Sequence, residues 1–186
     1  MNKILFFFIL VVMFCGCATY ERRINLSPQK APNWKELNSR HFKSGCNQGE
    51  IEVSPLVLGV EGSGSTFFFI PIPSSKERLK IVNEEGPWIY VKFRSKTRIE
   101  SCDLSFISLE DQKSGNQINP FRAETAVFND DYSEIHQTDC RYFFDLKKNP
   151  ESKYNLHVSK EVFNCDLEPI PYTYEKACEI WPMQMM

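Results

Sequence analysis

Clustered basic residues are scarce in this chain, and no run of Lys and Arg exceeds two residues. The 186 residues contain 22 Lys and Arg against 24 Asp and Glu, so the formal net charge is −2 at pH 7. A protein that binds nucleic acid needs a clustered basic surface to neutralise phosphates. We therefore expect no nucleic-acid partner.

Residues suited to catalysis or metal binding are also few. The chain has three histidines, His41, His136 and His157, and lacks the Gly-x-Ser-x-Gly motif of many serine hydrolases. The acidic segment 128–140 lacks the central glycine of a calcium loop, and His136 with Cys140 supplies two zinc ligands without a second pair. We expect no catalytic residue, no metal site and no cofactor.

Amphipathic helical periodicity is missing too, because no window of 11 or more residues carries a convincing apolar stripe at helical spacing. Short segments rich in β-branched and aromatic residues occur instead, bounded by Gly, Pro, Asn, Asp or Ser. This pattern predicts an all-β protein, first an antiparallel immunoglobulin-like β-sandwich and second a small β-barrel. The expected strands are 51–53, 56–58, 66–70, 79–82, 88–94, 99–109, 141–146, 154–163 and 172–174.

Two of these strands have a clear alternation of apolar and polar side chains. In segment 88–94, Ile89, Val91 and Phe93 share one face, and the polar residues between them share the other. In segment 101–108, the same pattern places Cys102, Leu104 and Phe106 on one face. We expect these two apolar faces to be buried.

The first residues have the layout of a secretory signal peptide. Lys3 provides a positive charge, and residues 4–14 contain no charged residue, Gly or Pro. This apolar run is shorter than the roughly 20 residues that a membrane-spanning helix needs. We interpret it as an export signal.

Residues 14–18, Phe-Cys-Gly-Cys-Ala, follow the apolar run and resemble the lipobox of bacterial lipoproteins. The resemblance implies cleavage before Cys17 and lipid attachment to Cys17; the alternative is an ordinary signal cleaved near Gly16 or Ala18. With this signal peptide (1–16), we expect a lipidated Cys and a flexible tether (17–36), because Pro28, Pro32 and several polar residues occur there without a sustained period of 2 or 3.6, and then a single β-rich envelope domain (37–186). Enteric lipoproteins that stay in the inner membrane often have Asp directly after the lipidated Cys, but this chain has Ala18 there. If the organism is Gram-negative, Ala18 therefore favours delivery to the outer membrane.

Five further cysteines follow Cys17, in a chain that we expect to reach an oxidising compartment. We expect two disulfides and one remaining cysteine. The favoured pairs are Cys102 with Cys140 and Cys165 with Cys178, because Pro169 and Pro171 predict a bend between the second two. Cys46 is then left unpaired or bonded to a partner, although counting alone does not decide the connectivity.

Segment 59–66 has the glycine spacing of a phosphate-binding loop, but Ser65 stands where the essential Lys would be. We interpret Gly62, Ser63, Gly64 and Ser65 as a flexible hairpin loop and a possible contact surface. The apolar segment 67–73 follows, and its two prolines favour an edge strand.

These features lead to two hypotheses of function. The first is a membrane-anchored envelope lipoprotein with a non-catalytic binding or structural role toward an envelope protein or a cell-wall polymer. The second is a periplasmic inhibitor or immunity-type lipoprotein that blocks a hydrolase.

Overall fold

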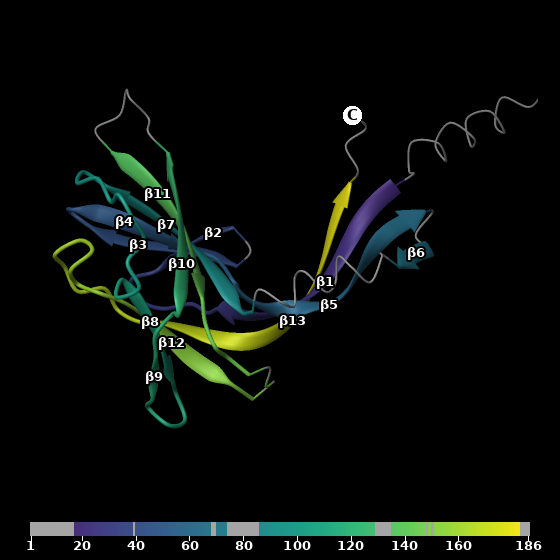
Figure 1. The fold of residues 1–186 in the computed structure, drawn as a ribbon. Coiled ribbons are helices and arrows are strands. Elements are labelled where there is room, and N and C mark those ends of the chain that lie inside the picture. The colour runs from purple at the N-terminus through teal and green to yellow at the C-terminus, as the bar shows by residue number, and fades with distance from the viewer. Residues whose placement is uncertain are drawn as a thin grey trace, which may run out of the picture. The chain divides into compact units, whose positions relative to one another are not determined.

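The structure, a computed structural model, describes residues 17–38, 40–67, 70–73, 86–128, 135–147, 149 and 151–182. Within these ranges the chain forms strands and no helix, so the predicted all-β class is confirmed (Figure 1). No segment of this described part is a helix long and apolar enough to cross a membrane. The strands are β1 (Cys17–Pro28), β2 (Lys35–Asn38), β3 (His41–Cys46), β4 (Gly49–Val53), β5 (Leu56–Phe67), β6 (Ile70–Pro73), β7 (Trp88–Ser95), β8 (Ile107–Asp111), β9 (Gln117–Ile118), β10 (Arg122–Phe128), β11 (His136–Phe143), β12 (Lys153–Val158) and β13 (Ile170–Pro182).

The strands join in one open antiparallel sheet with the order β2-β3-β4-β7-β5-β1-β13-β12-β8-β9. Strand β7 also pairs with β11, which in turn pairs with β10, and β6 pairs with β5. Antiparallel pairing is what many short strands without intervening helices predict.

The chain divides into two compact units, where the sequence predicted a single domain over 37–186. One unit comprises Met1–Ile24, Gly59–Glu84 and Lys176–Met186, and the other comprises Asn25–Leu58 and Glu85–Glu175. Strands β1, β5 and β13 each contribute residues to both units. We call the second of these units the main unit, because it contains most of the described strands.

Strand β7 confirms the predicted alternation of side chains. Ile89, Val91 and Phe93 are fully buried, whereas Tyr90 is 39% exposed and Arg94 is exposed. Phe93 packs edge-to-face against Phe106 and Phe163, with ring centroids about 6 Å apart. The period of two therefore identified the core side of this strand correctly.

The predicted strand 99–109 is wrong over most of its length, because β8 begins only at Ile107. The carboxylate of Asp103 accepts hydrogen bonds from the Ser105 amide and hydroxyl, both 2.8 Å long, and this local turn replaces strand pairing. The same hydrogen bonds lower the pKa of Asp103. Leu104 is consequently 40% exposed, although the sequence placed it on the buried face.

The expected tether at 17–36 has structure of its own. Residues 17–28 form β1, in which Ile24 and Leu26 are buried. Trp34 is also buried, and its indole Nε1 donates a hydrogen bond to the Glu168 carbonyl, 2.8 Å away. Where a flexible tether was expected, the structure therefore has a strand and a buried tryptophan, and residues 25–36 are part of the main unit.

Candidate functional site

Five strands of the main unit, β3, β4, β7, β11 and β10, lie side by side and place alternate side chains on a common outer face. Their register defines a row in which Lys43, Glu52, Lys92 and Asp139 follow one another across the strands. We call the exposed side of these five strands the outer face. Figure 1 shows β3, β4, β7 and β11 as neighbours.

Opposite charges alternate along this row. The Glu52 carboxylate lies 3.5 Å from His41 Nδ1 and 3.7 Å from Lys92 Nζ. Asp139 lies on β11, which pairs with the opposite edge of β7 from β4, and it is directly across from Lys92. Asp139 accepts a hydrogen bond of 3.2 Å from Gln137 Nε2. Because these side chains are partly exposed, the pairs contribute little to stability, and their main effect is to orient one another.

Aromatic rings and an arginine lie next to this row. Trp88 and Tyr90 are edge-to-face, with centroids 6.1 Å apart, and the Arg141 guanidinium carbon lies 5.1 Å and 5.5 Å from the two ring centres. Arg141 Nη1 is also 3.4 Å from Glu124 Oε2. The guanidinium thus holds the two rings in place by cation–π contacts while a carboxylate orients it.

A small pocket opens on the outer face between these groups. Its volume is about 160 Å³, and its walls are His41, Glu52, Ser54, Tyr90, Lys92 and Asp139. The Ser54 hydroxyl donates to the Tyr90 carbonyl over 3.0 Å and accepts from the Tyr90 amide over 3.1 Å. Ser54 therefore ties the end of β4 to β7.

The walls of this pocket carry groups that form hydrogen bonds and one aromatic ring. The two carboxylates accept hydrogen bonds, Lys92 donates them, and Tyr90 offers an aromatic surface. Among the residues that the structure describes, no three His, Cys, Asp or Glu side chains are grouped to hold a metal ion. The sequence placed Tyr90 and Lys92 on an outer face, but it did not identify Glu52 or Asp139, which only the strand register brings beside Lys92.

The predicted disulfide between Cys102 and Cys140 is present. Their Cα atoms are 5.8 Å apart, and both residues are buried. Cys140 lies on β11, and the Cys102 amide donates a 2.9 Å hydrogen bond to Thr125 Oγ1 on β10. This bridge fastens the loop before β8 to the sheet behind the outer face.

The predicted pairing of Cys165 with Cys178 is wrong, because Cys165 is bonded to Cys46. The expected bend does not form, since β13 starts at Ile170 and runs extended through Cys178 to Pro182. Cys46 is therefore not the remaining cysteine. The bond joins the end of β3 to the loop after β12 across 119 residues of sequence, a relation that no local pattern indicates.

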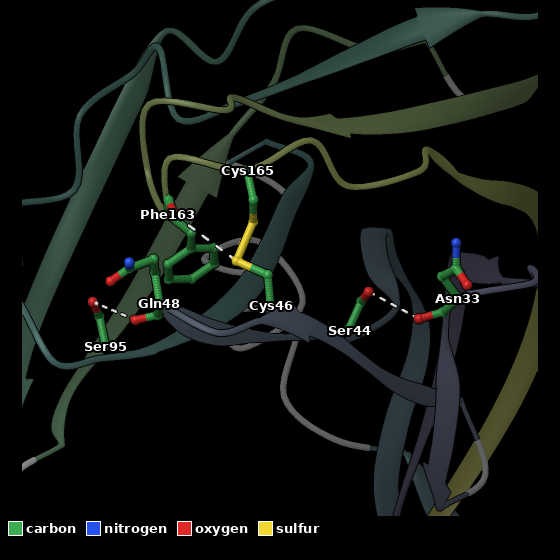
Figure 2. The surroundings of a disulfide bond; sticks show 7 residues. All are labelled: Asn33, Ser44, Cys46, Gln48, Ser95, Phe163 and Cys165. Atoms are coloured by element: carbon green, nitrogen blue, oxygen red, sulfur yellow. Dashed lines mark hydrogen bonds between the residues drawn. A yellow bond between two sulfur atoms is a disulfide. The ribbon is translucent and has the colours of Figure 1, made fainter.

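Figure 2 shows how the Cys46–Cys165 bridge is surrounded. The Phe163 carbonyl oxygen lies 3.8 Å from Cys46 Sγ, and the Phe163 ring covers Gly49, where an added Cβ would lie 2.5 Å from its Cε1 atom. Ser95 Oγ donates a 3.3 Å hydrogen bond to the Gln48 carbonyl in the β3–β4 turn. The bridge and the ring thus hold that turn against the segment after β12, and the Ser95 hydrogen bond holds it against β7.

The predicted contact loop is not a loop. Gly62, Ser63, Gly64 and Ser65 lie inside β5, where Gly64 pairs with Pro73 and Ser65 pairs with Ile72 of β6. The glycines permit a strand as well as a turn, so the neighbouring strand-forming residues decided the outcome. Strand β6 pairs only with β5 among the described strands, which agrees with its two prolines.

The other predicted positions are dispersed. Cys17 is the first residue of β1, and its lipidation stays a prediction. His136 begins β11, and His157 Nε2 on β12 lies 2.7 Å from Glu110 Oε2 on β8. The expected strand 79–82 and residues 129–134 of the acidic segment lie outside the described residues.

Comparison with known proteins found no match for this chain among protein-family models, curated protein sequences or solved structures.

Proposed function

We propose that this chain is a lipid-anchored bacterial envelope protein with a non-catalytic binding role, and that the outer face is its ligand-binding surface. The observation that carries the proposal is the cluster of Trp88, Tyr90 and Arg141, of which Tyr90 also forms a wall of the pocket. These three residue types are the ones most enriched among residues that dominate binding energy. The cluster lies on an alternating polar surface, as a binding centre inside a polar rim does.

The arrangement of these residues favours binding over stability as their role. Tyr90 remains 39% exposed although Trp88 and Arg141 lie against it, so a large aromatic surface is held in one orientation. A side chain that is already ordered loses less conformational entropy when a ligand binds. The outer face therefore combines exposed contact area with preorganisation.

The anchor in this proposal is a lipid on Cys17, after removal of residues 1–16. Supporting this part are the lipobox-like residues 14–18 and the two disulfides, which suit an oxidising compartment. Ala18 after the lipid cysteine makes the outer membrane the favoured location in a Gram-negative cell. Because β1 begins at Cys17, the lipid would join the fold without a free tether.

We also propose that the main unit is an immunoglobulin-like sandwich, with β2-β3-β4-β7-β11-β10 in one layer and β13-β12-β8-β9 in the other. This is supported by Phe93 of β7, which packs on Phe106 and Phe163 from the segments that flank β8 and β12. Burial of both Leu109 on β8 and Leu156 on β12 also agrees with a second layer.

Photocrosslinking of the full-length chain in its own envelope tests the binding role. A photoreactive amino acid replaces Arg94, which lies on the outer face beyond the pocket, and the products are compared with and without Trp88→Ala or Arg141→Ala. A crosslink to a constant envelope component that both substitutions abolish supports the proposal. A crosslinked hydrolase that loses activity supports the inhibitor hypothesis instead, and crosslinks unaffected by either substitution contradict the assigned surface.

A further inference from the structure

We infer that the outer-face pocket binds one pyranose ring of a neutral glycan, with Tyr90 as the stacking platform and Glu52, Lys92 and Asp139 as hydrogen-bonding partners of the sugar hydroxyls. This inference rests on the proposed binding function and names its ligand class.

The charges in the pocket exclude the simpler ligands. A phosphate or sulfate would meet the Glu52 and Asp139 carboxylates, and a metal cation would meet the Lys92 ammonium between them. Both ligands would have to overcome repulsion from a fixed like charge. A neutral ligand with many hydroxyl groups avoids this repulsion, because each hydroxyl donates to a carboxylate or accepts from the ammonium.

Tyr90 gives the pocket an aromatic wall, which matches the apolar face of a sugar ring. A pyranose ring presents a face of C–H groups, which packs on the flat surface of an aromatic ring. Tyr90 is suited to this contact, because Arg141 and Trp88 hold its ring and two hydrogen bonds to Ser54 hold its backbone. A larger hollow of about 300 Å³ near Lys113 and Ser152 has no aromatic residue in its walls, so it offers hydrogen bonds without such a platform.

The size of the pocket limits what enters it. Its volume of about 160 Å³ lies below the roughly 300–1,000 Å³ of pockets that enclose whole drug-sized ligands. A single ring fits this smaller space, and the remainder of a polymer extends across the outer face. Binding of one ring is then weak by itself, and a lipid-anchored protein gains strength from several copies on one polymer.

The test uses the full-length chain in a detergent without a sugar headgroup. The probes are neutral oligosaccharides of hexose units and of N-acetylhexosamine units, immobilised for screening and then titrated by calorimetry. Tyr90→Ala should weaken binding about ten-fold or more, and Tyr90→Phe should keep most of it because the ring is retained. Asp139→Asn should weaken binding less than Tyr90→Ala.

Lys160→Gln is the control for loss of a surface charge, because Lys160 is exposed in the segment after β12, outside the five strands of the outer face, and does not line the pocket. Circular dichroism and disulfide mapping establish that each variant is folded. If no neutral oligosaccharide binds, or if Tyr90→Ala binds as well as the wild type, the glycan inference is overturned. Equal binding of sulfated and neutral oligosaccharides overturns the charge argument in the same way.

Failure of this inference differs measurably from failure of the proposed function. If the photocrosslink at position 94 captures an envelope protein in a manner that depends on Trp88 while oligosaccharides fail to bind, the binding role stands and its ligand is a protein. If both experiments are negative, the outer face is not a binding surface.

Discussion

Lys92 of β7 lies directly opposite Asp139 of β11 in the antiparallel register, and Glu52 of β4 is opposite Lys92 on its other side. One cation therefore stands between two carboxylates on the exposed side of the sheet. The neighbouring residue of β7, Val91, points into the core and is fully buried. This contrast between adjacent residues is the basis of the first prediction.

Val91→Asp should destabilise the protein by about 3 kcal/mol or more, because it places an unpaired carboxylate in the core. Lys92→Gln should change the free energy of unfolding by less than about 1 kcal/mol, because Lys92 is partly exposed. Urea unfolding followed by circular dichroism measures both. Equal tolerance of the two substitutions would show that the faces of β7 are assigned incorrectly.

Gly49→Ala should destabilise the β3–β4 turn by about 1–3 kcal/mol through overpacking. The new Cβ would lie 2.5 Å from Phe163 Cε1 and 2.6 Å from the Arg94 carbonyl oxygen. Gly115→Asn is the control, because Gly115 has a positive φ of 71° that Asn tolerates and no atom within 4 Å of an added Cβ. Thermal unfolding compares the two, and a larger loss for Gly115→Asn would contradict this packing.

Peptide mapping without reduction should recover two crosslinked pairs, Cys46–Cys165 and Cys102–Cys140. Replacing both Cys46 and Cys165 with Ser should cost about 2–5 kcal/mol, because the unfolded chain loses the constraint of a long loop. Recovery of a peptide that joins Cys165 to Cys178 would instead restore the pairing that the sequence suggested.

Stability should fall above pH 10 because of Tyr172. Burial raises the pKa of this tyrosine well above its ordinary value of 10.0, so the folded protein keeps the phenol protonated while the unfolded chain releases the proton. The unfolded state then binds fewer protons, and the free energy of unfolding decreases as pH rises through about 10. Unfolding measured from pH 8 to 11 should show a shallower decrease for Tyr172→Phe than for the wild type.

The same substitution also removes the 2.9 Å hydrogen bond from the Tyr172 hydroxyl to the Ser54 carbonyl. At neutral pH it should therefore cost about 1 kcal/mol. The pKa of Tyr142 is raised by burial as well, and its hydroxyl has no hydrogen-bond partner among the residues that the structure describes. Tyr142→Phe is the companion variant and should be neutral or stabilising at pH 7. If the free energy of unfolding falls equally steeply from pH 8 to 11 in the wild type, Tyr172→Phe and Tyr142→Phe, the two tyrosines are not the cause.

Cys17→Ser should abolish lipid attachment and either release the protein from membranes or leave its signal peptide uncut. Several acyl chains give stable anchoring, so the wild type should stay in the membrane fraction after a salt wash. Cys15→Ser is the matched control and should be processed normally. An unmodified Cys17 thiol in membrane-free wild-type protein, found by mass spectrometry, would contradict the lipoprotein proposal.

Local patterns in the sequence were sufficient for the fold class and for the faces of β7. The alternation of Ile89, Val91 and Phe93 with polar residues depends only on the two-residue period of a strand. The predicted pairing of Cys102 with Cys140 was also correct. Local patterns misled at Leu104, where the Asp103 turn outcompetes strand pairing, and at Gly62 to Ser65, where glycines join a strand.

The candidate site depends on contacts between distant parts of the chain. Glu52 and Lys92 are 40 residues apart in the sequence and Lys92 and Asp139 are 47 apart, and only the register of β4, β7 and β11 makes them neighbours. The bond from Cys46 to Cys165 likewise spans 119 residues. Strand pairing and disulfide partners are selected by the packing of the whole core, because a shift of one residue would turn every buried side chain toward solvent. A short-range period identifies which side chains face outward, whereas the tertiary fold decides which of them meet.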